Sequence, residues 1–315
     1  MRKYIKSELY YGIYSQIYIV VALILLAIAT IIIYSNCNQI VNAYHSYRKT
    51  EEYYNANHID IEDALSDEYT YNSSKDGEGE IENIENPLRY YRELIGINAY
   101  IASPSYAIPS VLEYASCLFF PLLFGILGII TGTYDTKYKT KRIKAIRLSK
   151  SKIIASKQIA LIISSILIVA VVLFASYLIS FLLNKMVLAN VPLQNFDIHT
   201  IETKSPMIMK IMYGMGIALL FSEIGLFAGT ILKGAVIPII ILFSYSLMIP
   251  NLGRYDLKNI MLFSAQNVYD YSGSFAINKP FEISHLENSI LWIFVIVITL
   301  GGSYLAVRKR SSYNC

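Results

Sequence analysis

Long apolar stretches alternate with polar segments along this chain of 315 residues. A helix needs roughly 20 apolar residues to cross a hydrocarbon core about 30 Å thick. Six stretches approach this length, although the fifth, Ala235 to Ile249, is short and contains Pro238. The pattern predicts an all-α membrane protein with six transmembrane helices. We place them at residues 17–36, 109–133, 158–184, 207–249 (the fourth and fifth helices) and 289–307.

The composition supports the same class of protein. Hydrophobic residues make up 55% of the chain and charged residues only 16%, which is more apolar surface than one soluble domain of this length buries. The net charge of +4 is small, so no nucleic-acid partner is indicated. Three cysteines and four histidines show neither paired disulfide spacing nor the spacing of metal ligands. We therefore expect no metal site and no cofactor on this chain.

Positive charge is concentrated in the connector between the second and third apolar stretches, residues 134–157. This connector holds nine Lys and Arg residues and a single acid, Asp135. Short loops rich in Lys and Arg remain on the cytoplasmic side of a membrane. With the connector inside, both termini are cytoplasmic, including the tail at residues 308–315. We expect a multi-pass protein of the cell membrane whose spans are in contact with the lipid bilayer.

The remaining segments differ in their polarity. Residues 1–16 are basic and amphipathic, which is typical of an interfacial helix. Residues 37–108 are expected outside as a large first extracellular loop, rich in acids, and its many tyrosines favour partial folding over full disorder. Residues 185–206 form a second outer loop. The semi-polar residues 250–288 are expected to be a re-entrant region that dips into the outer membrane interface.

Two pairs of glycines with small-xxx-small spacing lie in the predicted spans. Gly128 and Gly132 belong to the second span, and Gly225 and Gly229 belong to the fourth. Such pairs allow two membrane helices to approach closely. Chance occurrence of glycine in glycine-tolerant spans is the alternative for these positions.

Two carboxylates fall within the spans and are candidate residues of a transport pathway. Glu113 lies near the outer end of the second span, where it can reach the interface at little cost. Glu223 lies in the inner part of the fourth span. Since an ionised carboxylate facing lipid is costly, we expect Glu223 to face protein or water. The alternative is a structural carboxylate satisfied near the cytoplasmic end of its helix.

Sequence motifs for catalysis are missing from the chain. There is no glycine-rich phosphate loop followed by Lys-Ser or Lys-Thr, no nucleophile elbow and no zinc-type histidine–glutamate motif. We expect no catalytic residue and no ATP hydrolysis on this chain. Energy for any transport must come from a partner.

The connector has the pattern of a docking helix. If it is helical, Tyr138, Arg142 and Ile146 share one face, edged by lysines. Such a face fits a groove on a partner protein. The alternative is a solvated basic loop attracted to anionic lipid. Periodicity alone leaves both interpretations open.

The connector also resembles a segment of a known family. Asp135, Thr140, the run Ser149-Lys150-Ser151-Lys152-Ile153 and Lys157 are similar to the acid, Gly-Thr, Ser-Arg-x-x-Ile and Lys pattern of type 2 ATP-binding-cassette permeases. This sequence departs from the pattern at Lys139, where the family usually has Gly, and at Lys150, where it has Arg. The resemblance implies a cytoplasmic coupling helix. The coupling residues it implies, together with the docking face, are Asp135, Tyr138, Thr140, Arg142, Ile143, Ile146, Arg147, Leu148, Ser149, Lys150 and Lys157.

The resemblance extends to the interfacial first helix, six spans, a large first outer loop and a re-entrant last outer region. It implies a permease subunit of a bacterial exporter, which pairs with a second permease subunit, identical or different, and with separate ATPase subunits that carry ATP and Mg²⁺. A peptide, a bacteriocin or an amphipathic drug is the implied substrate class. The alternative is a non-transporting membrane sensor or scaffold whose acidic outer domain binds a ligand. An enzyme embedded in the membrane is a third class.

Overall fold

A computed structural model describes residues 1–76, 79–140, 144, 146, 149–189, 191–271 and 279–309. The described chain is mainly helical, as predicted. Five of its helical stretches are long and apolar enough to cross a membrane, so the protein is a helical membrane protein. These stretches are Ile17–Ala56, Pro104–Lys137, Lys150–Val187, Met207–Leu232 and His285–Ala306.

The chain divides into two compact units. Residues 1–29, 111–175 and 203–315 form the first unit, and residues 30–110 and 176–202 form the second. Three helices contribute to both units: α2 (Ile17–Ala56), α5 (Pro104–Tyr114) and α8 (Lys150–Leu188).

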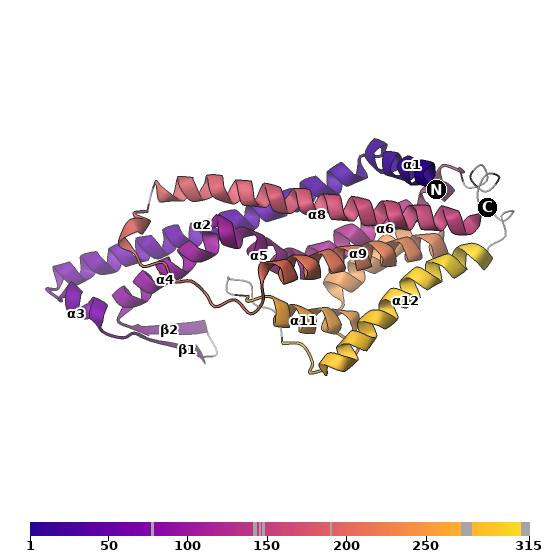
Figure 1. Ribbon diagram of the computed structural model, residues 1–315. Coiled ribbons are helices and arrows are strands. Elements are labelled where there is room, and N and C mark those ends of the chain that lie inside the picture. The colour runs from indigo at the N-terminus through magenta and orange to yellow at the C-terminus, as the bar shows by residue number, and fades with distance from the viewer. Residues whose placement is uncertain are drawn as a thin grey trace. The chain divides into compact units, whose positions relative to one another are not determined.

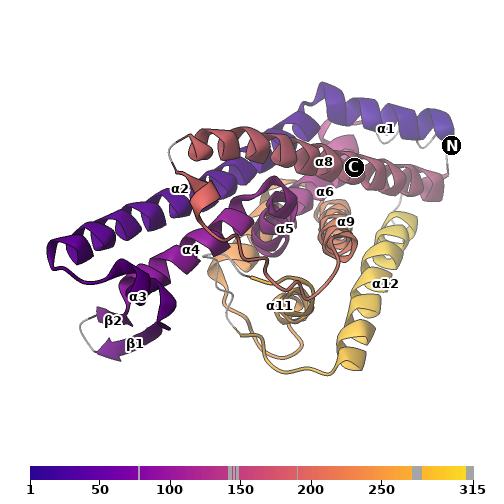
Figure 2. The ribbon, with the colours of Figure 1, turned by 60° about the vertical axis from the view of Figure 1, so that its left-hand side comes forward.

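The first unit contains a bundle of helices. It begins with α1 (Arg2–Tyr14), and its central helices are α6 (Phe120–Lys137) and α9 (Met207–Leu232), which lie side by side (Figure 1). Helices α11 (Leu257–Val268) and α12 (His285–Lys309) pack on α9 (Figure 2). The remaining elements of this unit are η1 (Ala115–Phe119), α10 (Val236–Phe243) and η3 (Ser244–Met248).

Glycines set the distance between α6 and α9. A Cβ atom added to Gly128 would lie 1.9 Å from the backbone oxygen of Ser222, and one added to Gly225 would lie 2.0 Å from the backbone oxygen of Gly125. A Cβ added to Gly229 would lie 2.6 Å from the oxygen of Ile129. The two small-xxx-small pairs of the sequence therefore face each other, and the predicted close helix approach is confirmed.

The fifth apolar stretch remains short in the structure. Helix α10 and the π-helical segment η3 that continues it run from Val236 to Met248. At 1.5 Å of rise per residue this length spans about 20 Å, less than a hydrocarbon core of about 30 Å. A membrane crossing at the fifth predicted span therefore stays a prediction.

The second unit is more regular than the expected outer loop. Helix α2 continues to Ala56 because residues such as Ile33, Ile40 and Ala43 keep a buried stripe at helical spacing beyond the predicted end of the span. Polar residues on the other faces of the helix, such as Asn38, Gln39 and Asn42, hid this periodicity. The strands β1 (Thr70–Asp76) and β2 (Gly79–Glu85) then form an antiparallel hairpin, which the all-α prediction did not include. The other elements of this unit are α3 (Ile61–Ser66), α4 (Pro87–Ala102) and η2 (Leu193–Asn195).

Tyrosines contribute to the packing of the second unit. The Tyr90 ring lies 5.5 Å from that of Tyr69 and 5.7 Å from that of Tyr71, measured between ring centroids. Asn86 caps α4 by accepting a hydrogen bond from the Arg89 amide at 3.3 Å. The described residues of the acidic region thus include regular elements that pack against one another.

The helices around the connector are longer than the predicted spans. Helix α6 continues to Lys137, and α8 begins at Lys150 instead of near Gln158. The basic residues at these helix ends do not stop the helices, because lysine is a good helix former. The last part of the predicted connector is therefore the first two turns of α8.

Substitution of one interface glycine tests the α6–α9 packing. Gly225→Ala places a methyl group against the Gly125 carbonyl, and overpacking of this kind costs about 1–3 kcal/mol. We expect a lower thermal midpoint in detergent. Gly216→Ala on the same helix is the matched control, because a Cβ there meets no atom within 4 Å. Equal midpoints for the two variants would contradict the packing.

Candidate functional site

A cluster of charged side chains lies at the junction of α1, α6, the connector and α8. We call it the inner polar cluster, and its members are Glu8, Asp135, Thr140, Lys144 and Lys157. Asp135 Oδ1 accepts from Thr140 Oγ1 at 2.9 Å and lies 2.7 Å from Lys144 Nζ. Its other oxygen, Oδ2, lies 3.0 Å from Lys157 Nζ. Lys144 Nζ also donates to Glu8 Oε1 at 2.5 Å. The Asp135 carboxylate thus binds residues in the middle of the connector, Thr140 and Lys144, and a residue at its C-terminal end, Lys157.

Lys157 joins α8 directly to α6. Besides its ion pair with Asp135, its Nζ donates to the backbone oxygen of Thr131 at 2.6 Å. Since Asp135 and Thr131 are one turn apart on α6, the ammonium group is held between two groups of the same helix face. The start of α8 is therefore fixed against the end of α6.

The turn after α6 depends on a left-handed residue. Lys139 has φ 55°, and the amide of Thr140 donates to the backbone oxygen of Asp135 at 3.1 Å. A left-handed residue at a helix end is usually glycine, because a side chain is strained there. Lys139 is the position at which the type 2 permease pattern has Gly.

The inner polar cluster is almost fully withdrawn from solvent. The exposed fractions of the side chains are 4% for Lys157, 6% for Glu8, 8% for Asp135 and 13% for Lys144. Two carboxylates and two ammonium groups balance each other, as buried charges require. Burial alone would lower the pKa of Lys144, but the carboxylates of Asp135 and Glu8 outweigh it and raise the pKa. Lys144 therefore stays charged at physiological pH.

Tyrosine rings pack beside the inner polar cluster. The rings of Tyr11 and Tyr134 are 5.4 Å apart, and those of Tyr134 and Tyr138 are 4.7 Å apart. Lys144 Nζ lies 5.0 Å from the centroid of the Tyr11 ring. A cation close to an aromatic face is stabilised by the ring quadrupole. Helix α1 is thus attached to the connector by both an ion pair and aromatic packing.

Other predicted coupling residues of the connector are exposed. Ile146 is 84% exposed and Tyr138 is 53% exposed. Ser149 is exposed and Lys150 is half-buried. The predicted residues Arg142, Ile143, Arg147 and Leu148 lie outside the described residues. The structure thus separates Asp135, Thr140 and Lys157, which hold the connector, from Ile146, which is exposed, and from Tyr138, which is half exposed beside Tyr134.

The two candidate pathway carboxylates have different surroundings. Glu223 is 6% exposed, so it faces protein, as predicted. Gln158 is a nearby polar group that interacts with it, but neither carboxylate oxygen has a partner with hydrogen-bond geometry among the described residues. Glu113 is 2% exposed and does not reach the solvent, contrary to expectation. Its neighbours Leu112 and Ala115 are buried as well, so this part of the helical stretch lies within packed protein.

Sequence reasoning missed two members of the inner polar cluster, Glu8 and Lys144. Glu8 is the one acid within residues 1–16, and an acid in an otherwise basic amphipathic helix was a signal for a buried pair. A second buried ion pair was also missed. Lys210 of α9, 1% exposed at its side chain, pairs with Asp270, 3% exposed, beyond the end of α11. The Asp270 carboxylate also accepts from the amide of Lys204 at 2.6 Å.

No group of three or more potential metal ligands comes together within the part of the chain that the structure describes. No protein-family model, curated protein or solved structure matches this chain. The interpretation of the site therefore depends on its own geometry and on the resemblance of the connector.

Removal of the central carboxylate tests the inner polar cluster. Asp135→Asn leaves Lys157 buried without its counter-charge and removes one of the two carboxylates that pair with Lys144. Such a change costs about 3–5 kcal/mol of unfolding free energy. Glu8→Gln should cost less, because Lys144 keeps Asp135. Thermal unfolding in detergent, followed with a thiol-reactive dye, measures whether Asp135→Asn lowers the midpoint more than Glu8→Gln does.

Asp197→Asn provides the control for Asp135→Asn. The side chain of Asp197 is 79% exposed and lies 3.6 Å from Arg92, and exposed pairs contribute about 0–1 kcal/mol. We expect its midpoint to match that of the wild type. If Asp135→Asn also unfolded at the wild-type midpoint, the cluster would not hold the connector.

Proposed function

We propose that this chain is the membrane-spanning permease subunit of an ATP-binding-cassette exporter. It works with a second permease subunit and with separate ATPase subunits, which bind ATP and Mg²⁺. The connector, residues 134–157, is the surface that contacts an ATPase subunit. One observation carries the proposal: the connector presents Ile146 and Tyr138 outward while a buried cluster of charges fixes its ends to the membrane helices.

The arrangement of the connector suits the transmission of force. A displacement of the connector acts on α6 through Asp135, on α8 through Lys157 and on α1 through the Glu8–Lys144 pair. Coupling between distant sites is carried by packed side chains and rigid helices. A solvated basic loop that only attracts lipid needs no such buried attachment. The attachment therefore favours a partner that moves the connector over a passive loop.

The transport pathway is the less defined part of the proposal. Helix α9 crosses the first unit and carries Glu223, whose carboxylate is buried without a hydrogen-bond partner among the described residues. A buried carboxylate of this kind in a membrane helix is by default a functional candidate. Together with Glu113 and the acidic residues 51–85, it suits a cationic or amphipathic substrate such as a peptide, bacteriocin or drug.

The proposal also sets the topology in the membrane. Six crossings, with α10 and η3 as the short fifth, put the connector and both termini in the cytoplasm of a cell-membrane protein. The excess of Lys and Arg in residues 134–157 and 308–310 supports this orientation. The second unit then contains the extracellular acidic region, and the segment around α11 lies at the outer interface.

A sensor or scaffold is the second candidate function. The regular structure of the acidic region, with its hairpin and the tyrosines around Tyr90, favours it, because a disordered loop would not preserve a ligand surface. A sensor binds its ligand without an ATPase, whereas a permease is isolated with one. Purification from native membranes followed by an assay of Mg²⁺-dependent ATP hydrolysis distinguishes the two.

Substitution of the exposed connector isoleucine tests the coupling role. Ile146→Asp places a charge within an apolar contact, where it lacks a partner. We expect the variant to reach the membrane and to unfold at the wild-type temperature, since Ile146 is 84% exposed, but to lose most of the ATPase that is isolated with the wild type. Capture of the ATPase and its hydrolysis rate are the measurements.

Two control sets accompany Ile146→Asp. Ile59→Asp changes an exposed isoleucine of the acidic region and should leave ATPase capture unchanged. Stepwise replacement of Lys137, Lys139 and Lys150 by Gln tests attraction to lipid, which predicts losses that follow the number of charges removed. Normal capture and stimulation of the ATPase by Ile146→Asp would refute the coupling role.

A further inference from the structure

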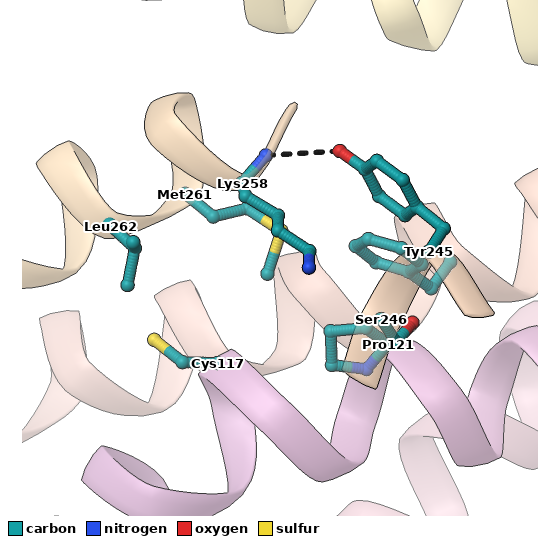
Figure 3. A pocket seen from close by; sticks show the side chains of 8 residues that line it. Cys117, Pro121, Tyr245, Ser246, Lys258, Met261 and Leu262 are labelled. Carbon is teal, nitrogen blue, oxygen red and sulfur yellow. Dashed lines mark hydrogen bonds between the residues drawn. The ribbon is translucent and has the colours of Figure 1, made fainter. Parts of the chain in front are cut away.

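A cavity of about 90 Å³ lies in the first unit between η1, the start of α6, α9, η3 and α11 (Figure 3). It is separate from the inner polar cluster and from the connector. Its apolar walls are Cys117, Pro121, Phe221, Met261 and Leu262. The cavity is partly open at the surface.

Two π-helical segments line this cavity. Cys117 belongs to η1 (Ala115–Phe119), and Ser246 belongs to η3 (Ser244–Met248). In η1 the wider turn has a local cause, because Pro121 provides no amide proton and its ring would clash with the carbonyl of Cys117 four residues earlier. Single π-helical turns inside α-helices are rare and occur frequently at functional sites. Two of them at one cavity point to a binding site.

The polar groups of the cavity include an ammonium group with no paired acid. Lys258 Nζ donates to the backbone oxygen of Ile249 at 2.5 Å and lies 5.1 Å from the centroid of the Tyr245 ring, and within the described chain it makes no ion pair. Its neighbour Asp256 is engaged instead by the Tyr245 hydroxyl and by the amide of Leu252. Burial lowers the pKa of Lys258, and Asp256 offsets this effect only in part.

A hydroxyl group accompanies this ammonium group. Ser246 Oγ is buried and has no hydrogen-bond partner among the described residues. Figure 3 shows the Lys258 side chain extending from α11 toward Ser246 and Pro121. An ammonium and a hydroxyl donor that line the same cavity are typical of a site for an anionic group.

The size of the cavity limits the rest of the ligand. A water-sized group needs about 10–15 Å³ of such cavity volume, so a cavity of about 90 Å³ has room for roughly six to nine of these groups. Since Cys117, Phe221, Met261 and Leu262 form its walls, these groups are apolar. The complementary ligand therefore has one anionic head and a short buried segment of hydrocarbon chain.

We propose that this cavity binds an anionic amphiphile, with its phosphate or carboxylate on Lys258 and Ser246 and part of one acyl chain between the apolar walls. An anionic phospholipid of the bilayer and a free fatty acid share this chemistry. The site is independent of the ATPase coupling proposed above, since none of its residues belongs to the connector.

Native mass spectrometry of the full chain in detergent tests the proposal. The probes are phosphatidylglycerol, phosphatidylcholine and decanoate. We expect one phosphatidylglycerol or one decanoate to bind more tightly than phosphatidylcholine. Lys258→Gln should weaken this binding roughly tenfold, because it removes a charge-assisted hydrogen bond. Lys258→Arg should retain it, and the thermal midpoints of both variants check their folding.

Two further variants separate the cavity from general surface charge. Ser246→Met fills the cavity but keeps the ammonium group, and it should weaken binding of the chain-bearing probes. Lys185→Gln removes an exposed lysine that also lies over an aromatic ring, at 4.5 Å from Phe181, and should have no effect. Binding of phosphatidylglycerol alone, or of decanoate alone, supports the proposal and identifies the source of the ligand. Equal binding of phosphatidylcholine, or undiminished binding by Lys258→Gln, overturns it.

Discussion

The buried carboxylate of Asp135 is the group on which the connector depends. It accepts from Thr140 and pairs with both Lys144 and Lys157, so a single side chain holds the end of one membrane helix, the turn that follows and the start of the next. Charges withdrawn from water persist only when they are paired. This requirement turns a segment that is rich in mutually repelling lysines into a fixed element. Helix α1 joins the same cluster through Glu8.

The membrane helices provide the rigid frame to which this element is attached. Lipid gives no hydrophobic drive for helix association, so close packing has to supply it. The glycines of α6 and α9 bring the two backbones into contact, and the last turn of α6 carries Asp135 of the inner polar cluster. Packed helices therefore link the connector to α9, which carries Glu223. The cavity around Lys258 lies at the other end of α6, next to η1, where the helix geometry departs from α.

Sequence periodicity and charge predicted the parts of this structure that depend on neighbours in the chain. Hydropathy located the long apolar helices, and small-xxx-small spacing indicated where helices can approach closely, although not that α6 packs on α9. The Lys144–Glu8 pair joins residues 136 positions apart, so no local pattern indicated it. Polar residues such as Asn38 and Gln39 concealed the continuation of α2 beyond its predicted span, and the hairpin at β1 and β2 has no alternation strong enough to predict. The resemblance pointed to Asp135, Thr140 and Lys157, but not to the binding of both Thr140 and Lys157 by Asp135.

Amide hydrogen exchange tests most directly whether the buried cluster fixes the connector. The wild-type chain and Asp135→Asn are compared in lipid nanodiscs, with exchange read over α1, residues 134–157 and the core of α9. The structure predicts that the substitution accelerates exchange in the connector, in α1 and in the first turns of α8, while the core of α9 stays protected. Unchanged exchange of the connector in Asp135→Asn would contradict the account.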